Sequence, residues 1–372
     1  MSDLKIMRTP RSIDIDITNN CNLRCKYCSH FSGPGDVKQD LQTEEWLSFF
    51  KELGGLNVMD VVFAGGEPFV RDDLKVLIAA VVENRMRFSI LSNGTLITDD
   101  MAKFIYDTGR CNSVQVSIDG AGPETHDVFR GKGCFEKAVK GISFLKKHNV
   151  SVDVRVTVNK SNVGELDKIA KLLLEDLELP GFSTNAASFL GLCRENEAQV
   201  HLSVEDRTFA MEKLLQLNRK YDDRISASAG PLAEAKMWLN MEQARMENKD
   251  SLPGGGFLTA CGCVNVRIGV RADGVIVPCP MLSHIELGRI VKDSLMDIWQ
   301  NHPKMIEMRM RAQIPLSDFD FCSGCDYISY CTGNCTGLSY TRTGKEHHPS
   351  PDECLRRFLE EGGKLPDNCC EE

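Results

Sequence analysis

The sequence has no long hydrophobic run and no excess of positive charge. The segment from Met1 to Asp14 contains no apolar stretch of signal-peptide length, and no later stretch approaches the roughly 18 uninterrupted apolar residues of a membrane helix. The net charge is −9, so the chain as a whole does not attract phosphate backbones. We therefore expect a cytoplasmic protein whose partners are neither nucleic acids nor membranes.

Cysteine, by contrast, is abundant, with 16 residues in a chain of 372. A secreted disulfide scaffold would be short and would carry a signal peptide, and this chain fits neither description. Cysteines that are kept reduced in the cytosol at this density usually bind metal. Zinc and iron–sulfur clusters are both compatible with the count alone.

Short β-branched runs alternate with amphipathic helical runs from Ser12 to about Ala187. The expected strands are residues 12–18, 58–63, 87–91, 113–118, 152–158 and 182–185. The expected helices are residues 43–53, 72–83, 98–107, 135–148 and 163–176, the last opened by an N-cap box of Asn162 and Glu165. Consecutive βα units require a parallel sheet with right-handed crossovers, as an open sheet or a partial barrel.

Three cysteines follow the first expected strand directly, as Cys21-x3-Cys25-x2-Cys28. Loops at the carboxyl ends of parallel strands are where α/β proteins place their catalytic sites. Three thiolates on one short loop can hold three irons of a four-iron cluster and leave the fourth iron open. The alternatives for this spacing are a zinc knuckle or three buried thiols.

The run Cys21-Asn-Leu-Arg-Cys25-Lys-Tyr-Cys28, together with Gly65-Gly66-Glu67-Pro68 after the second strand, resembles the radical S-adenosylmethionine (SAM) enzymes. The resemblance implies a partial (β/α)6 barrel, a SAM-binding [4Fe-4S] cluster, and a 5′-deoxyadenosyl radical that abstracts hydrogen from a substrate. It also implies a set of cofactor-binding positions. These are Tyr27 through its backbone, Gly65, Gly66, Glu67, Pro68, Asn93, Ser117, Asp119 and Arg155, the last weighed against a salt-bridged surface arginine.

The cysteines after residue 260 resemble the SPASM extension of radical SAM enzymes, which carries two auxiliary clusters. By that resemblance Cys261, Cys263, Cys279 and Cys335 hold one cluster. Cys322, Cys325, Cys331 and Cys354 hold the other, and a pair of zinc ribbons is the alternative. Both clusters are expected to be [4Fe-4S]. The close spacing of Cys261 and Cys263 leaves open whether both are ligands and whether the first cluster holds fewer irons.

This assignment divides the chain into a barrel (1–200), a helical bridge (201–256), whose first helix starts at Ser203 and Asp206, and a SPASM domain (257–372). It leaves five cysteines over. We expect Cys111 and Cys134 to be packed thiols and the pair Cys369 and Cys370 to lie in a mobile tail. Cys193 is the one candidate catalytic residue, weighed against a core thiol.

Radical SAM enzymes with this extension mostly modify ribosomally made peptides, by a crosslink, a thioether or excision of part of the backbone. Pro280 stands where sulfatase-maturing relatives carry a catalytic aspartate, which argues against that activity. Tetrapyrrole or small-molecule modification is an alternative, and an iron–sulfur electron carrier is the non-enzymatic one. Expected partners are a precursor peptide, a flavodoxin or ferredoxin as electron donor, and a separate small leader-binding protein, because only about eleven residues precede the first strand.

Overall fold

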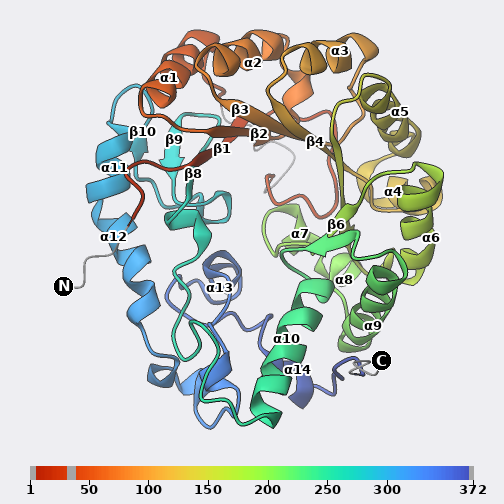
Figure 1. The fold of residues 1–372 in the computed structure, drawn as a ribbon, viewed down its shortest axis with the longest axis vertical. Coiled ribbons are helices and arrows are strands. Elements are labelled where there is room, and N and C mark those ends of the chain that lie inside the picture. The colour runs from red at the N-terminus through yellow and green to blue at the C-terminus, as the bar shows by residue number, and fades with distance from the viewer. Residues whose placement is uncertain (1–5, 32–38, 368–372) are drawn as a thin grey trace.

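The computed structural model describes residues 6–31 and 39–367, and its centre is one sheet of ten strands in the order β10-β9-β8-β1-β2-β3-β4-β5-β6-β7 (Figure 1). Neighbouring strands from β8 to β7 in this order are parallel, and β9 pairs antiparallel with both β8 and β10. The six strands at its centre are β1 (Ser12–Thr18), β2 (Asp60–Gly65), β3 (Arg87–Ser92), β4 (Cys111–Ser117), β5 (Val152–Val158) and β6 (Phe182–Ala186). The predicted series of parallel βα units is confirmed.

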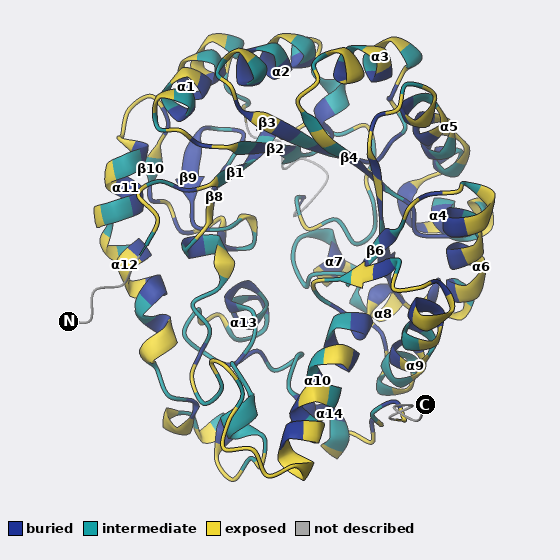
Figure 2. Ribbon diagram, viewed as in Figure 1, coloured by how far each residue is buried: buried dark blue, intermediate teal, exposed yellow. Residues whose placement is uncertain are grey.

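Helices cover the outer face of these strands, where alternate strand residues are buried (Figure 2). In β1, Ile13, Ile15 and Ile17 are buried, while the residues between them face the inner side of the curved sheet. The covering helices are α1 (Thr43–Gly55), α2 (Leu74–Glu83), α3 (Asp99–Asp107), α4 (Pro123–Arg130), α5 (Cys134–Lys147) and α6 (Leu166–Lys171). Trp46, Phe49, Phe50 and Leu53 of α1 are fully buried in the shared core, as their spacing predicts.

The sheet extends beyond the predicted barrel at both edges. β7 (Ile225–Ala227) lies inside the segment predicted to be a helical bridge, between α9 (Val204–Lys220) and α10 (Pro231–Met246), and pairs with β6. β8 (Arg267–Val270), β9 (Val275–Val277) and β10 (Gly288–Arg289) come from the C-terminal part, and β8 pairs with β1. The bridge is therefore not purely helical, and the boundary drawn at residue 257 cuts through one continuous sheet.

The N-cap box predicted at Asn162 and Glu165 is wrong. The chain there begins as a 3-10 turn and ends as a π-helical turn around α6, and the Asn162 side chain makes no cap hydrogen bond. Its amide instead donates to the carbonyl oxygens of Asp119 and Thr157 in the buried interior. The capping box at Ser203 and Asp206 is confirmed at the start of α9.

The C-terminal part completes the ring seen in Figure 1. It contains α11 (Leu295–Asn301), α12 (Pro303–Met310), α13 (Thr336–Thr343) and α14 (Leu355–Glu360), and the regular structure between α12 and α13 consists of short 3-10 turns. Two four-residue helices, α7 (Leu192–Glu195) and α8 (Glu197–Val200), follow β6. Among the residues that the structure describes, none of the helices combines the length and apolar character needed to cross a membrane.

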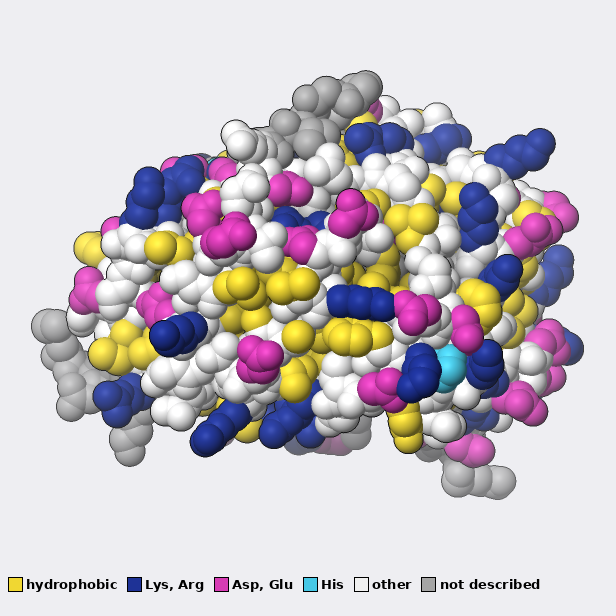
Figure 3. Space-filling model, turned by 90° about the horizontal axis from the view of Figure 1, so that it is seen from above, with side chains coloured by type: hydrophobic (Ala, Val, Ile, Leu, Met, Phe, Trp, Pro, Cys, Tyr) yellow, Lys and Arg dark blue, Asp and Glu magenta, His cyan; other side chains and the backbone are white. Residues whose placement is uncertain are grey.

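On the face that Figure 3 shows, acidic and basic side chains are interspersed over the outer helices, with apolar side chains between them. Charges of both signs are therefore mixed on this face, without a large area of one sign. The features that bear on function lie inside the ring, at the carboxyl ends of the strands.

Candidate active site and cluster-binding cysteines

The loop with Cys21, Cys25 and Cys28 begins three residues after β1 ends, at the carboxyl edge of the sheet. Burial, together with the neighbouring thiols of Cys28 and Cys21, raises the pKa of Cys25 to about 12, although the positive charge of Arg130 lowers it. The three thiols are therefore close enough to act on one another. A bound metal centre would favour their thiolate forms, because binding releases the protons.

Gly65 and Gly66 dock the end of β2 against this cysteine loop. The Gly65 backbone has φ +113°, and a side chain there would place its Cβ 2.4 Å from the carbonyl oxygen of Thr18. A Cβ on Gly66 would lie 2.1 Å from the carbonyl oxygen of Asn20, so only glycine fits at either position. The Gly66 and Glu67 amides donate to these same two carbonyl oxygens, at 2.9 and 2.8 Å. This close approach holds the glycine pair beside the three thiols.

The side chain of Glu67 is turned inward, not toward open space. It is 1% exposed and accepts hydrogen bonds from the Ser92 hydroxyl at 2.9 Å and the Asn93 amide at 2.7 Å. Burial raises its pKa to about 7, although these hydrogen bonds lower it. The Asn93 side chain in turn donates to Asn22 at 3.0 Å and lies 3.9 Å from the Cys21 sulfur. Glu67 thus joins the loops after β1, β2 and β3.

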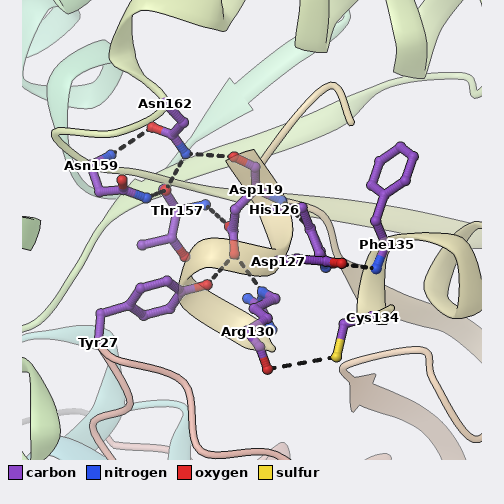
Figure 4. A network of polar contacts seen from close by, with 10 residues as sticks. All are labelled: Tyr27, Asp119, His126, Asp127, Arg130, Cys134, Phe135, Thr157, Asn159 and Asn162. Carbon is purple, nitrogen blue, oxygen red and sulfur yellow. Dashed lines mark hydrogen bonds and ion pairs between the residues drawn. The ribbon is translucent and has the colours of Figure 1, made fainter. Parts of the chain in front are cut away.

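Asp119 stands at the centre of a buried polar network (Figure 4). One carboxylate oxygen accepts hydrogen bonds from the Tyr27 hydroxyl and the Arg130 guanidinium, and the other accepts one from the Thr157 amide at 2.8 Å. The resemblance places Asp119 among the cofactor-binding positions, and here both of its carboxylate oxygens have protein donors. The network ties the cysteine loop, through Tyr27, to α4 and β5.

The inward-facing residues of the strands line a large cavity that is open to solvent. Arg155 of β5 faces this cavity, and its Nε donates to the Ser183 hydroxyl at 3.3 Å. It is thus not a surface arginine, and Ser117 is its register partner on β4. Three aspartates and three arginines line the cavity, so its charges nearly balance. They are Asp14, Asp16, Asp153, Arg155, Arg224 and Arg267.

The first C-terminal cysteine group is brought together from distant segments. Hydrogen bonding to Cys261 lowers the pKa of Cys263, but hydrogen bonding to Cys279 and burial raise it, to about 12 overall. Cys261 also acts electrostatically on Cys335, a second reason to treat all four as one group. Both members of the close pair therefore lie within the group, with Cys261 in the left-handed region at φ 62°.

The second C-terminal group lines one pocket with about 420 Å³ of empty space, formed by Cys322, Cys325, Cys331 and Cys354 among apolar side chains. Burial raises the pKa of Cys322 to about 12, and the other three thiols raise it further. Within the described ranges, no three or more His, Cys, Asp or Glu side chains are arranged to hold a single metal ion. The eight predicted cysteines nevertheless act on one another within two sets of four, and thiols are the donors that iron–sulfur clusters use.

The five remaining cysteines belong to none of the three groups. Cys193 is 4% exposed and lines a second cavity of about 1220 Å³, between the end of β6, α10 and α13. Cys134 is buried and contacts the Arg130 carbonyl, and Cys111 is half-buried in β4, so both are packed thiols as expected. Cys369 and Cys370 lie outside the described residues.

Two features of the site were not predicted. Asp16 faces the large cavity, with His30 at 4.0 Å, and the isoleucines that alternate with it in β1 could have shown that it points away from the core. Arg130 pairs with Asp119, 11 residues earlier, and nothing in the local sequence marks it. The fold and the three cysteine groups together define an α/β barrel protein with an iron–sulfur cluster-binding extension.

Comparison with known families identifies the protein further. The radical SAM superfamily model matches residues 15–173, and the model of an iron–sulfur cluster-binding domain, SPASM, matches residues 261–326. The chain belongs to the radical SAM superfamily and is a radical SAM enzyme with a SPASM domain. Its cofactors are accordingly SAM, a [4Fe-4S] cluster in the barrel and auxiliary iron–sulfur clusters in the SPASM domain.

Relatives with several substrates resemble the chain. It is 28% identical to Fe-coproporphyrin III synthase of Methanosarcina barkeri, covering 86% of this chain and 81% of that one. It is 27% identical to the sporulation killing factor maturation protein SkfB of Bacillus subtilis, covering 78% and 64%. The structure of SuiB from Streptococcus suis, bound to its precursor peptide SuiA, superposes with a TM-score of 0.70 at 15% identity, covering 94% and 77%, and this supports the fold alone.

Proposed function

We propose that the chain binds SAM at the cysteine loop of the barrel and modifies a ribosomally made precursor peptide. The observation that carries the peptide substrate is the meeting of two cavities at Met281. The barrel cavity and the cavity beside α13 are both lined by Met281, and the second one also reaches Cys335. In this proposal the two cavities form one passage from the barrel interior toward Cys335 of the first SPASM cysteine group, which suits an extended chain.

In this proposal Cys21, Cys25 and Cys28 bind the barrel cluster. When bound, the cluster and SAM supply a 5′-deoxyadenosyl radical, which takes a hydrogen atom from the substrate. The backbone of Gly65 and Gly66 lines the methionyl end of SAM, and Arg155 holds its carboxylate from the floor of the cavity. The network of Asp119 and Arg130 fixes the cysteine loop through Tyr27. Surrounding protein excludes water from the radical.

The eight SPASM cysteines bind the auxiliary clusters in the same proposal. Cys261, Cys263, Cys279 and Cys335 hold the first cluster, and Cys322, Cys325, Cys331 and Cys354 hold the second. Within each set, the thiols are close enough to shift one another's pKa, which supports this division.

A tetrapyrrole is the second candidate substrate, because a tetrapyrrole enzyme is among the relatives. The charges of the barrel cavity favour the peptide. Asp14 and Asp16 face a space in which a polycarboxylate ring would have to place its acidic groups, and Arg267 lies 3.6 Å from Asp14 while His30 lies 4.0 Å from Asp16. Like charges in a low-dielectric cavity repel strongly, whereas peptide amides pair with either sign.

The test incubates reconstituted protein anaerobically with SAM, dithionite and a precursor peptide encoded beside the gene, and reads the peptide mass. The proposal predicts a mass change that requires SAM. A parallel reaction with Fe-coproporphyrin III should give no product, and turnover of the porphyrin without turnover of peptide would replace the proposal by the second candidate. Adding a neighbouring small protein, or flavodoxin in place of dithionite, tests the predicted leader-binding partner and electron donor in the same assay.

The passage itself can be tested by Met281→Trp, which adds bulk where the two cavities meet. We expect peptide modification to fall at least about tenfold, since a misplaced substrate loses that much or more. Formation of 5′-deoxyadenosine without peptide should continue. Met246→Trp is the matched control, because Met246 is 66% exposed at the end of α10. Equal peptide turnover by both variants would contradict the passage.

A further inference from the structure

Arg311 is a fully buried cation beside the first SPASM cysteine group, and the function described above does not use it. It follows α12 directly and donates hydrogen bonds to four backbone carbonyl groups. Nη1 donates to Thr259 and, at 3.5 Å, to Asn334. Nε donates to Glu346 at 3.1 Å and Nη2 to His348 at 3.1 Å.

Two of these carbonyl groups belong to the segments that carry cysteines of the first group. Thr259 lies two residues before Cys261, and Asn334 lies immediately before Cys335. The two segments are more than 70 residues apart in the chain, at 259–261 and 334–335. One guanidinium group therefore holds together two cysteines that must be close for a shared cluster.

The charge of Arg311 is not balanced by a carboxylate. Among the described residues, none of the recorded ion pairs includes Arg311, whereas Arg130 beside Cys25 is paired with Asp119. An unpaired buried charge costs several kcal/mol, so a charge of opposite sign is expected nearby. Burial lowers the pKa of Arg311 to about 10, and the thiols of Cys335 and Cys261 are the neighbouring groups that oppose this.

We propose that Arg311 is the positioning and charge-compensating residue of the first auxiliary cluster, holding the segments of Cys261 and Cys335 in place and raising the cluster's reduction potential. This rests on the ligand assignment of the proposed function. Reduction of a cluster adds one electron, and a fixed positive charge in a low-dielectric interior stabilises the more negative state. Removing the charge should therefore shift the midpoint potential of this cluster to a more negative value.

Arg309 provides a matched control two residues away. It is also an arginine at the end of α12 and is 1% exposed. Its Nε donates to the Val264 carbonyl group at 2.9 Å, its guanidinium lies over the Trp299 ring, and none of the cysteines acts on its charge. Loss of Arg309 removes a buried guanidinium without removing a charge from the cysteine group.

The experiment measures iron content and electron paramagnetic resonance (EPR) redox titrations of anaerobically reconstituted full-length variants. All carry Cys21, Cys25 and Cys28 replaced by alanine, so that only auxiliary signals remain. Cys335→Ala and Cys354→Ala, made singly in this background, assign each signal to its cluster. If Cys335→Ala removes no cluster, the ligand assignment is overturned, and the role of Arg311 with it.

Arg311→Met should shift only the signal that Cys335→Ala removes, toward a more negative potential, and Arg311→Lys should restore much of that shift. Arg309→Met should leave both midpoints unchanged. If Arg311→Met does not retain the first cluster but keeps the second, and Arg311→Lys retains both, the positioning role is supported. The proposal would be overturned if Arg311→Met keeps its full iron content and shows unchanged midpoint potentials. It would also be overturned if both clusters are lost in Arg311→Met and in Arg311→Lys alike.

Discussion

The cysteine loop of the barrel and the cysteines of the C-terminal part stand on different kinds of scaffold. The loop extends from β1, whose isoleucines Ile13, Ile15 and Ile17 are buried in the large core shared by sheet and helices. The regular structure of the chain from Arg311 to Cys354 consists of short 3-10 turns and one short helix. The small apolar cluster beside it has only Leu258, Leu316 and Cys322 as buried members among the described residues. We therefore expect the barrel to fold on apolar burial, and residues 311–354 to depend on bound metal for their stability.

The boundary between these two kinds of scaffold does not coincide with the domain boundary. β8, α11 and α12 belong to the C-terminal part, yet Ile268, Trp299 and Met305 are buried in the barrel core. The part that depends on metal is therefore narrower than the SPASM domain. It begins after α12, at Arg311, where regular helix gives way to turns.

The largest expected effect comes from removing all iron with a chelator under anaerobic conditions. Amide hydrogen exchange in residues 311–354 should accelerate at least about tenfold, because local opening there loses its main stabilisation. Exchange in β1 to β6 should hardly change, and mass spectrometry of peptic fragments resolves the two regions. Comparable acceleration in the barrel strands would show that the two scaffolds do not differ.

Removing a single ligand should act on one cluster alone. With about twelve irons in the fully loaded chain, Cys354→Ala should lose up to about four and leave SAM cleavage by the barrel intact. Iron analysis and EPR spectra measure this. Cys111→Ala is the control, because Cys111 is a half-buried thiol of β4 outside the three groups, and it should keep all the iron. Full iron content in Cys354→Ala would remove it from the second set.

A smaller effect is expected at the close pair Cys261 and Cys263. Both lie within the first group, so each alanine variant should perturb the spectrum of the first auxiliary cluster and leave the second intact. The spectra of the single variants are compared with that of Cys335→Ala. If one of the pair gives an unchanged spectrum and iron content, that residue is not a ligand, and the first cluster has a position open to substrate.

Much of the barrel follows from the sequence, and the reasons differ from element to element. β1 and β5 were predicted to the residue, because isoleucine or valine alternates with polar residues along each. β7, β9 and β10 were missed, since strands of two or three residues show no period. The cysteine groups follow from the resemblance to radical SAM enzymes and their SPASM extension. The Asp119–Arg130 pair and the carbonyl partners of Arg311 are contacts between chain segments, and no local pattern reveals them.

The smallest expected effect is a pH dependence in the barrel itself. His126 is fully buried, and its Nδ1 accepts the Asp119 amide hydrogen at 3.1 Å. Burial, and then the charge of Arg130, lower its pKa from 6.5 to about 4. The unfolded chain then binds more protons between these values, so stability is complete above pH 6.5 and is lost as the pH falls toward 4.

Between pH 7 and 5 this loss amounts to about 2 kcal/mol in the free energy of unfolding. His126→Asn keeps an acceptor for the Asp119 amide but cannot take up a proton, so its stability should fall less over the same range. Urea unfolding of the iron-free protein at both pH values measures the difference. Parallel losses in the wild type and the variant would exclude His126 as the source.

The measurement that tests the central claim most directly is formation of 5′-deoxyadenosine from SAM by the reconstituted, dithionite-reduced protein. The wild type is compared with the variant in which Cys21, Cys25 and Cys28 are all alanine. The account predicts 5′-deoxyadenosine from the wild type, and none from the variant, which should retain the two auxiliary clusters and about two thirds of the iron. Continued 5′-deoxyadenosine formation by the variant, or none by the fully loaded wild type, would contradict the assignment of the active cluster to the barrel loop.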